Sequence, residues 1–475
     1  MIIPITIKNN HLHIFFISSV LLSYSIPLVN LFTSQIVCDW NYFNALNLVI
    51  RSSVLEYEIF PHHDPWVSGG VDLWANPQTR IFTPFLITDV LLLPHISNLL
   101  SLIIWGILGV YGCYRLLTYL GVEKLIAAIL SVVYINSSWF TLHYTEGHIT
   151  YGTFQLLAYI FYLVLRFDNA RYICYFILLQ ALFVLTGAFY TFIYSIYIFI
   201  FFQLFSINGI GLKVFYKTVI NNWKPIALTF ITFWLLSAIK LIPLLTIAPH
   251  STGYYDLIRM PLRFIFTSYL NPFHHKNINV WEYGDLRWGF QEFGTYFSVL
   301  GLILISINLF SKYTLLQTWK YLVIALLFFI ISIGWFEPIN PYRLMNALPF
   351  FSIAHVNSRF ILIVFIIFII LLGFTLSKFY TLIPPKYIFI ILSLLFLESI
   401  ITGNYSFYES FYKSKQIVPA SSFSNLITST TIEKTEYSYV KPDGYYNTNI
   451  AYWHTYEPFQ IRAASIRHLG DTITN

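Results

Sequence analysis

Carboxylates and histidines gather just after the first apolar segment of the chain. Asp39 follows that segment in "QIVCDWNYF", and His63 and Asp64 follow in "PHHDPW". A carboxylate fixed at a membrane surface can accept a proton from a hydroxyl group or ligate a divalent metal. Asp is also a favoured first residue of a helix, where it caps the backbone. From the residues alone, both interpretations of Asp39 stay open.

The same segment carries aromatic residues next to turn residues. Trp66 and Trp74 flank the Gly69–Gly70 pair, and Asn76 precedes a proline in "WANPQT". Glycine pairs and Asn-Pro predict tight turns. The indoles can stack on a ring-shaped ligand, although tryptophan is also common at membrane interfaces.

Four basic residues are candidates for binding a phosphate. Lys240 lies inside the apolar run "LLSAIKLIPLL", where a charge is costly and indicates function by default, unless it extends to the interface. Arg259 and Arg263 are four residues apart in "YYDLIRMPLRF" and share a face of any helix there. Arg359 lies at the mouth of a predicted helix. Guanidinium groups bind phosphates in a bidentate manner, but arginine beside lipid headgroups is ordinary.

A second histidine motif begins another apolar segment. His148 stands in "TEGHITY", two residues after Glu146. The histidine can pair with that carboxylate, or both can bind a divalent metal, Mg²⁺ or Mn²⁺. A histidine at the start of a helix can equally bond only to backbone. The sequence does not separate these interpretations.

The elements that must position these residues are apolar. Of 475 residues, 57% are hydrophobic and 10% charged, and the mean hydropathy is +0.67. Soluble domains have about 25% charged residues, so the composition predicts an all-α polytopic membrane protein. About 20 apolar residues cross a bilayer. The pattern predicts eleven transmembrane helices near residues 13–36, 95–117, 124–141, 150–166, 171–187, 188–207, 225–246, 294–310, 319–335, 359–377 and 386–402.

The distribution of charge predicts the orientation. Lysine and arginine collect at the N-terminus and in the short loops after every second predicted helix, where the acids are only Glu123 and Asp168. Cytosolic loops carry such an excess of basic residues. We therefore expect a cytosolic N-terminus and an extracytosolic C-terminus, which places the long polar segments outside.

The chain divides into two expected parts. Residues 1–402 form the transmembrane domain, whose first extracytosolic loop, 37–94, carries the candidate site. Within that loop, 43–57 can lie as an amphipathic helix on the surface, and 81–94 is too short to span and favours a re-entrant or interfacial helix. Residues 403–475 predict a small extracytosolic segment, β-rich in its pattern.

Other sequence features exclude some kinds of chemistry. Cys38, Cys113 and Cys174 form no closely spaced pair, so neither a disulfide framework nor a thiolate metal site is indicated. No glycine-rich phosphate loop follows a strand. A nucleotide-linked substrate is therefore disfavoured, and no nucleic-acid partner is expected.

The order of several motifs resembles the bacterial YfhO-like membrane proteins. These motifs are "DPWVSGGVDLWANPQTRIFTPF", "HYTEGHITYGTFQLLAYIFYLVL", "WGFQEFGTYFSVLGLIL" and "NALPFFSIAHVNSRFILIVFIIF". Such proteins are similar to the GT-C class of polytopic glycosyltransferases. The resemblance covers most of residues 37–375, and the large C-terminal region of many relatives is replaced by a short tail.

The resemblance implies a function and assigns residues to it. GT-C enzymes take sugar from a polyprenyl-phosphate-linked donor, and the acceptor here would be a glycan, lipid or protein of the cell envelope. An acidic residue of the first loop acts as base or metal ligand, which points to Asp39, with Asp64 second. His148 matches the Gly-His of the family, and Arg359 its Arg-Phe. The membrane would be the bacterial inner membrane.

A non-catalytic lipid-glycan flippase or carrier is the alternative function. A carrier predicts polar groups near the membrane midplane and broken helices in paired positions. Here polar residues concentrate in the outer loops. Glu398, inside "LLFLESIITG", is an exception that favours neither function.

Overall fold

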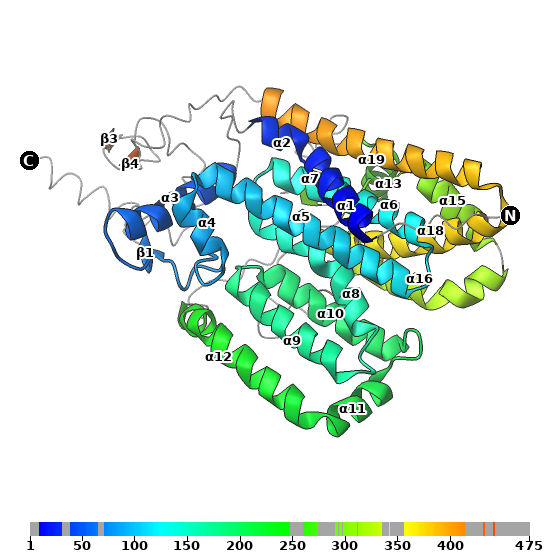
Figure 1. The fold of residues 1–475 in the computed structure, drawn as a ribbon, viewed down its shortest axis with the longest axis horizontal. Coiled ribbons are helices and arrows are strands. Elements are labelled where there is room, and N and C mark those ends of the chain that lie inside the picture. The colour runs from blue at the N-terminus through cyan, green and yellow to red at the C-terminus, as the bar shows by residue number, and fades with distance from the viewer. Residues whose placement is uncertain are drawn as a thin grey trace, which may run out of the picture.

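The described part of the computed structural model is mostly helical (Figure 1). It describes residues 9–30, 39–64, 71–247, 260–273, 290–292, 294–296, 298–310, 312–334, 342, 356–413, 431–432 and 440–441. Trp66 and Arg259 lie outside the described residues, as does most of the C-terminal segment.

The first half of the chain contains α1 to α10. Their bounds are α1 (Asn9–Ser23), α2 (Ser25–Asn30), α3 (Asp39–Leu55), α4 (Phe85–Leu91), α5 (Pro94–Tyr119), α6 (Lys124–Ile135), α7 (Ser138–Thr145), the 3-10 helix η1 (Ile149–Leu156), α8 (Leu157–Val164), α9 (Ala170–Leu185) and α10 (Phe189–Phe205). Strands β1 (His63–Asp64) and β2 (Val71–Asp72) pair antiparallel between α3 and α4, with His63 opposite Asp72.

The second half contains the remaining described helices. These are α11 (Leu212–Asn221), α12 (Trp223–Ile247), α13 (Leu262–Leu270), η4 (Phe290–Glu292), α15 (Val299–Leu309), α16 (Lys312–Ile333), η6 (Asn357–Phe360), α18 (Ile361–Leu382) and α19 (Pro385–Lys413). The last helix continues past residue 402, into the segment that we expected to be β-rich. Beyond it, the described residues include one two-residue strand pair, β3 (Thr431–Ile432) with β4 (Val440–Lys441).

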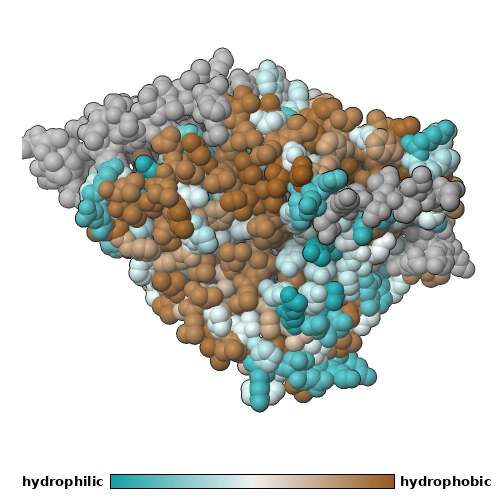
Figure 2. All heavy atoms as spheres, in the orientation of Figure 1, coloured by the Kyte–Doolittle hydropathy of each residue, from teal (hydrophilic) through white to brown (hydrophobic). Residues whose placement is uncertain are grey.

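Five helical stretches among the described residues are long and apolar enough to cross a membrane. They are Pro94–Tyr119, Lys124–Thr145, Trp223–Thr246, Asn357–Leu382 and Pro385–Tyr408. Figure 2 shows apolar side chains covering most of the visible face, with hydrophilic groups gathered toward its edges. The chain is therefore an all-α protein suited to a membrane, while the count of eleven spans stays a prediction.

The two apolar helices α18 and α12 are buried to very different extents. The spanning window of α18 is 83% buried, whereas that of α12 is 22% buried. Exposed side chains of α12 include Leu228, Ile231, Leu235 and Ile242. In water such a surface would be unfavourable, so α12 is suited to contact with lipid while α18 forms part of the protein core.

The first polar loop is built against one end of α5 (Figure 1). Pro94 occupies the first turn of α5, where its missing N–H costs nothing. The helix expected over 43–57 is present as α3, but it begins at Asp39 and residues 43–50 are buried. The expectation of a surface helix is therefore wrong, because α3 packs against α4 and α5.

Candidate active site

The first turn of α3 brings Asp39 to His148. The Asp39 carboxylate oxygen Oδ2 lies 3.1 Å from His148 Nε2, and the two side chains are 15% and 16% exposed. The backbone N–H of Asp39 donates to the carbonyl of Glu146 at 2.8 Å. Two residues singled out from separate sequence motifs therefore meet in one ion pair.

The end of α7 explains why His148 faces this way. Gly147 has a left-handed φ of +88°, its N–H donates to Tyr144, and the N–H of His148 donates to His143. This pair of bonds is the Schellman arrangement that ends many helices at glycine. A Cβ on Gly147 would lie 2.2 Å from the backbone nitrogen of Trp40. Glycine is thus required both for the turn and for its close approach to α3.

A second histidine extends the pair inward. His143 Nδ1 lies 2.7 Å from His148 Nδ1, and His143 is fully buried. With His148 Nε2–H assigned as the donor to Asp39, the shared proton lies between the two Nδ1 atoms. Burial lowers the pKa of His148, but the hydrogen bond and charge of Asp39 and the charge of Glu292 outweigh it, so the pKa is raised. Asp39, His148 and His143 are therefore joined by two consecutive close contacts, in which His148 holds the Asp39 carboxylate.

A buried ion pair completes this group. Arg359 of η6 donates to Glu292 of η4 through Nε at 2.5 Å and through NH2 at 2.8 Å. The guanidinium carbon also lies 4.9 Å from the Tyr151 ring centre and 4.7 Å from that of Tyr190. Below, the term charged cluster means Asp39, His143, His148, Glu292 and Arg359.

Three members of the charged cluster could hold a metal ion. His143, His148 and Glu292 each offer one ligand atom, and these atoms lie within 4.8 Å of one another. Two imidazoles and a carboxylate suit zinc, whereas Mg²⁺ favours oxygen ligands. The residues therefore fit the expected Mg²⁺ or Mn²⁺ less well than an ion that prefers nitrogen, and Glu292 already binds Arg359.

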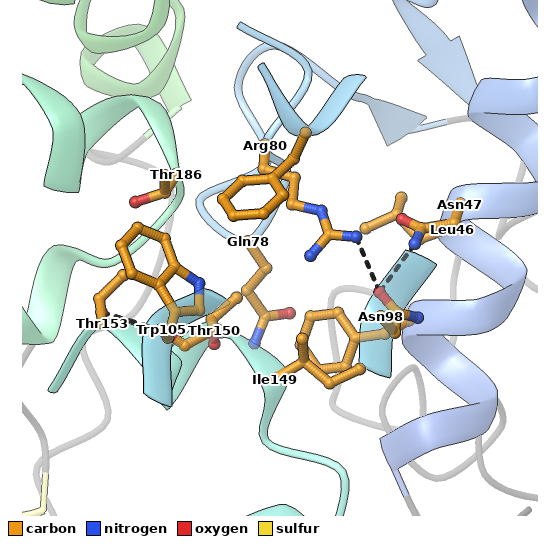
Figure 3. Close-up of a pocket in the computed structure, with 12 residues that line it drawn as sticks. Leu46, Asn47, Gln78, Arg80, Asn98, Trp105, Ile149, Thr150, Thr153 and Thr186 are labelled. Atoms are coloured by element: carbon orange, nitrogen blue, oxygen red, sulfur yellow. Dashed lines mark hydrogen bonds between the residues drawn. The ribbon is translucent and has the colours of Figure 1, made fainter. Parts of the chain in front are cut away.

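A separate polar pocket is lined by residues of α3 and η1, among other segments (Figure 3). We call it the neutral pocket; it is lined by Phe43, Leu46, Asn47, Gln78, Arg80, Phe85, Asn98, Trp105, Ile149, Thr150, Thr153 and Thr186. Phe43 lies one helical turn after Asp39, and Ile149 directly follows His148. The pocket and the charged cluster therefore share two backbone segments.

Arg80 of the neutral pocket is held by a buried carboxylate. Its Nε and NH2 donate to Asp89 at 3.0 and 2.5 Å, and Asp89 is fully buried. Ser97 donates to the same carboxylate at 2.6 Å. Among the described residues that line this pocket, the charged side chain is that of Arg80, and it is already paired with a carboxylate.

The candidates for phosphate binding are placed in different surroundings. Lys240 is buried, and its ammonium donates to the backbone carbonyl and, at 3.3 Å, to the hydroxyl of Thr79. Arg359 is committed to Glu292. Arg263 of α13 is exposed, with its guanidinium over the Phe264 ring. Of the three described candidates, Arg263 is the one at the surface.

The remaining predicted residues of the first loop lie around β1. His63 is exposed, whereas Asp64 is 4% exposed. Burial, with the charges of Asp64 and Asp39 contributing, raises the pKa of Tyr42 to about 12. The charges of Asp64 and Asp39 therefore both influence the Tyr42 hydroxyl.

Trp74 has a packing role in the first loop. Its indole N–H donates to the Pro61 carbonyl at 3.0 Å, and its ring packs against Phe60 and Phe82. These contacts stabilise the loop. The stacking of this indole on a sugar ring stays a prediction.

Several residues of the site were not predicted. His143 precedes His148 by five residues. The Glu146–Gly147 helix end between them was the sequence signal that could have indicated that the two histidines meet. Glu292 stands in "WGFQEFGTYF", a motif of the resemblance, without an expected role. The amides Asn47 and Asn98 carried no signal, because the pairing of two distant segments creates their contact.

Comparisons with family profiles, with curated proteins and with solved structures find no match to this chain. The resemblance to YfhO-like proteins therefore stays a prediction.

Proposed function

We propose that this protein is a membrane glycosyltransferase that takes sugar from a polyprenyl-phosphate-linked donor on the extracytosolic side. The observation that supports this most is the ion pair of Asp39 and His148. The Asp39 carboxylate is fixed at the first turn of a buried helix and lies beside His148. The ion pair of Glu292 and Arg359 belongs to the same charged cluster. A base held on a rigid element is suited to catalysis.

The proposed reaction uses these residues as follows. An acceptor hydroxyl gives its proton to Asp39 while its oxygen attacks the anomeric carbon of the donor. The bond from that carbon to the phosphate oxygen breaks, and the lipid phosphate leaves with the electron pair. His148 orients the carboxylate through its Nε2–H, and the transferred proton stays on Asp39 until the product leaves. Attack opposite the leaving group inverts the anomeric centre.

The leaving phosphate needs a cation at the outer membrane surface. Arg359 and Lys240 are buried, whereas Arg263 is exposed and accessible to a phosphate, so we assign this contact to Arg263. Arg263→Met should weaken donor binding and leave folding unchanged. If the wild-type protein and Arg263→Met bind the donor equally well, Arg263 has no role in the mechanism.

The proposed orientation rests on the alternation of basic loops. Cysteine introduced at Ser422 should react with a membrane-impermeant reagent from outside, and cysteine at Ser311 should not. The reverse labelling pattern would refute the orientation and, with it, the extracytosolic reaction.

The decisive experiment is sugar transfer by Asp39→Asn protein in proteoliposomes supplied with a polyprenyl-phosphate-linked sugar. Asparagine caps a helix about as well as aspartate, but it cannot take the proton. Losing a general base typically lowers the rate by about 10²- to 10⁴-fold. We expect a folded, donor-binding and inactive variant. Transfer near the wild-type rate would return Asp39 to a capping role.

A non-catalytic carrier of lipid-linked glycans is the second candidate. In its favour, Lys240 and Glu398 are ionisable groups inside apolar helices, a frequent feature of transport pathways. Both contact fixed partners, since Glu398 accepts from Tyr296 and Ser298. This candidate would be favoured if the protein moves a fluorescent lipid-linked sugar across the liposome membrane and Asp39→Asn does not change the rate of that movement.

A further inference from the structure

The neutral pocket presents many polar groups but no net charge. Its polar lining comes from α3, the 78–80 segment, α5, η1 and the end of α9, in the form of three carboxamides, three threonines and Arg80. The guanidinium of Arg80 is balanced by the fully buried Asp89. A phosphate would gain little from a cation already paired in this way, so the pocket favours an uncharged ligand.

Part of this lining is rigid. Asn98 Oδ1 accepts from Asn47 Nδ2 at 2.7 Å and from Arg80 NH2 at 3.0 Å, and Asn98 Nδ2 donates to Asn44 at 2.9 Å. Figure 3 shows the first two of these bonds along one side of the pocket. Asn47 and Asn98 are 3% and 1% exposed. Buried carboxamides fixed by such bonds hold their remaining polar atoms in defined directions.

Hydrogen bonding between helices is the simpler explanation of such amides in a membrane protein. It does not account for Gln78 and Thr150. Both side chains line the pocket, and neither makes a side-chain hydrogen bond within the described part of the chain. Figure 3 shows the Gln78 carboxamide near the centre of the lining residues. These two groups can therefore bond to a ligand without first breaking a bond to protein.

The size of the pocket limits what can enter it. Its interior offers about 20 Å³ to water-sized groups, which is room for about one hydroxyl-sized group. Trp105 forms an apolar wall, and its indole packs so closely on Gly152 that a Cβ there would lie 2.4 Å from it. A hydroxyl both donates and accepts, which matches carboxamides and threonines.

We infer that the neutral pocket binds one hydroxyl arm of an uncharged sugar whose ring stays at the pocket mouth, beside Asp39 and His148. This inference rests on the proposed function and adds to it: the sugar is recognised by carboxamides and threonines through a neutral hydroxyl, apart from the groups that bind phosphate. The same chemistry is available on the donor sugar and on a glycan acceptor.

Saturation-transfer NMR with methyl glycosides tests this binding directly. The full-length protein is placed in lipid nanodiscs, because maltoside detergents carry sugar themselves. The probes are methyl α-D-glucoside, galactoside and mannoside, together with their monodeoxy analogues. We expect signal from at least one glycoside and its loss when a single hydroxyl is removed. Inorganic phosphate should not compete.

Two variants locate the binding. Gln78→Leu and Thr150→Val each remove one hydrogen-bonding group and should weaken glycoside binding about 3- to 10-fold. Thr381→Val is the matched control, since Thr381 is exposed in α18 and bonds only to the carbonyl of Lys378. Thr381→Val should bind the glycoside with the same affinity as the wild-type protein.

Distinct results would overturn the inference or the proposed function. Equal affinity of wild type, Gln78→Leu and Thr150→Val, or competition by inorganic phosphate, would overturn the hydroxyl site. Glycoside binding that depends on Gln78, in a protein without transferase activity, would support the pocket and reject the transferase. In an active protein, a higher KM for the lipid-linked donor in Gln78→Leu identifies the donor sugar as occupant, and a higher KM for the acceptor identifies the glycan.

Discussion

The charged cluster and the neutral pocket are two polar regions inside one apolar protein, and they handle charge differently. In the pocket, the guanidinium of Arg80 is paired with the fully buried carboxylate of Asp89. In the cluster, the partner of Asp39 is the imidazole of His148, a group that can carry or lack a charge and whose pKa is raised beside the Asp39 carboxylate. A low-dielectric interior requires charges to be paired. The choice of partner decides whether the pair is only structural or can also move a proton.

The largest effect should come from breaking the structural pair. Arg80→Met leaves the Asp89 carboxylate buried without its cation, which typically costs about 3–5 kcal/mol. We expect a large drop in thermal unfolding temperature, measured in nanodiscs by tryptophan fluorescence. Asp39→Asn, at the pair that is partly exposed, should unfold close to the wild-type temperature. Equal stability of Arg80→Met and wild type would erase the contrast between the regions.

The turn that carries His148 should be the next most sensitive. Gly147→Ala must place a Cβ against the backbone of Trp40 at a left-handed φ of +88°. The backbone strain alone costs about 1–3 kcal/mol, and the clash adds to it. Gly121→Ala is the control, because Gly121 has a similar φ of +84° and nothing within 4 Å of the added Cβ. The two variants should differ in unfolding temperature and in sugar transfer, and similar behaviour would show that the close approach to α3 is unimportant.

A smaller effect is expected at Lys240. Lys240→Met removes the hydrogen bonds to Thr79 but also removes a buried ammonium, so the free energy of unfolding should change by only about 1 kcal/mol. Because Thr79 lies between Gln78 and Arg80, we expect the variant to bind glycosides more weakly while donor phosphate binding is unchanged. If Lys240→Met instead loses donor phosphate binding, Lys240 binds the phosphate, as the sequence predicted.

The smallest effect is a dependence of stability on pH. The pKa of His148 is raised in the folded protein, so its charged form stabilises the fold. That contribution is complete below about pH 6.5, the pKa of an unfolded histidine, and is lost as pH rises through the folded value. Unfolding temperatures measured between about pH 6 and pH 9 should fall more in wild type than in His148→Gln. Parallel curves would show that Asp39 does not hold a charged histidine.

Much of this architecture follows from local patterns. Runs of apolar residues predicted helices that the structure contains, because a membrane environment requires the backbone to bond within each segment. Gly147 after a helical run is a local stop signal, and a helix-capping role was one of the two interpretations that the sequence left open for Asp39. Burial of α3 was missed, because its amphipathic pattern does not reveal whether the polar face meets water or other amides such as Asn98.

By itself the sequence determined that this chain is an apolar helical protein and that Asp39 and His148 are candidate functional residues, since hydropathy and residue type are local properties. Only the tertiary structure decided that these two residues form a pair, that His143, Glu292 and Arg359 surround them, and that Lys240 lies against Thr79. These contacts join distant segments, as between Lys240 and Thr79, which are 161 residues apart. No local pattern specifies such a meeting, because it depends on how the helices pack against one another.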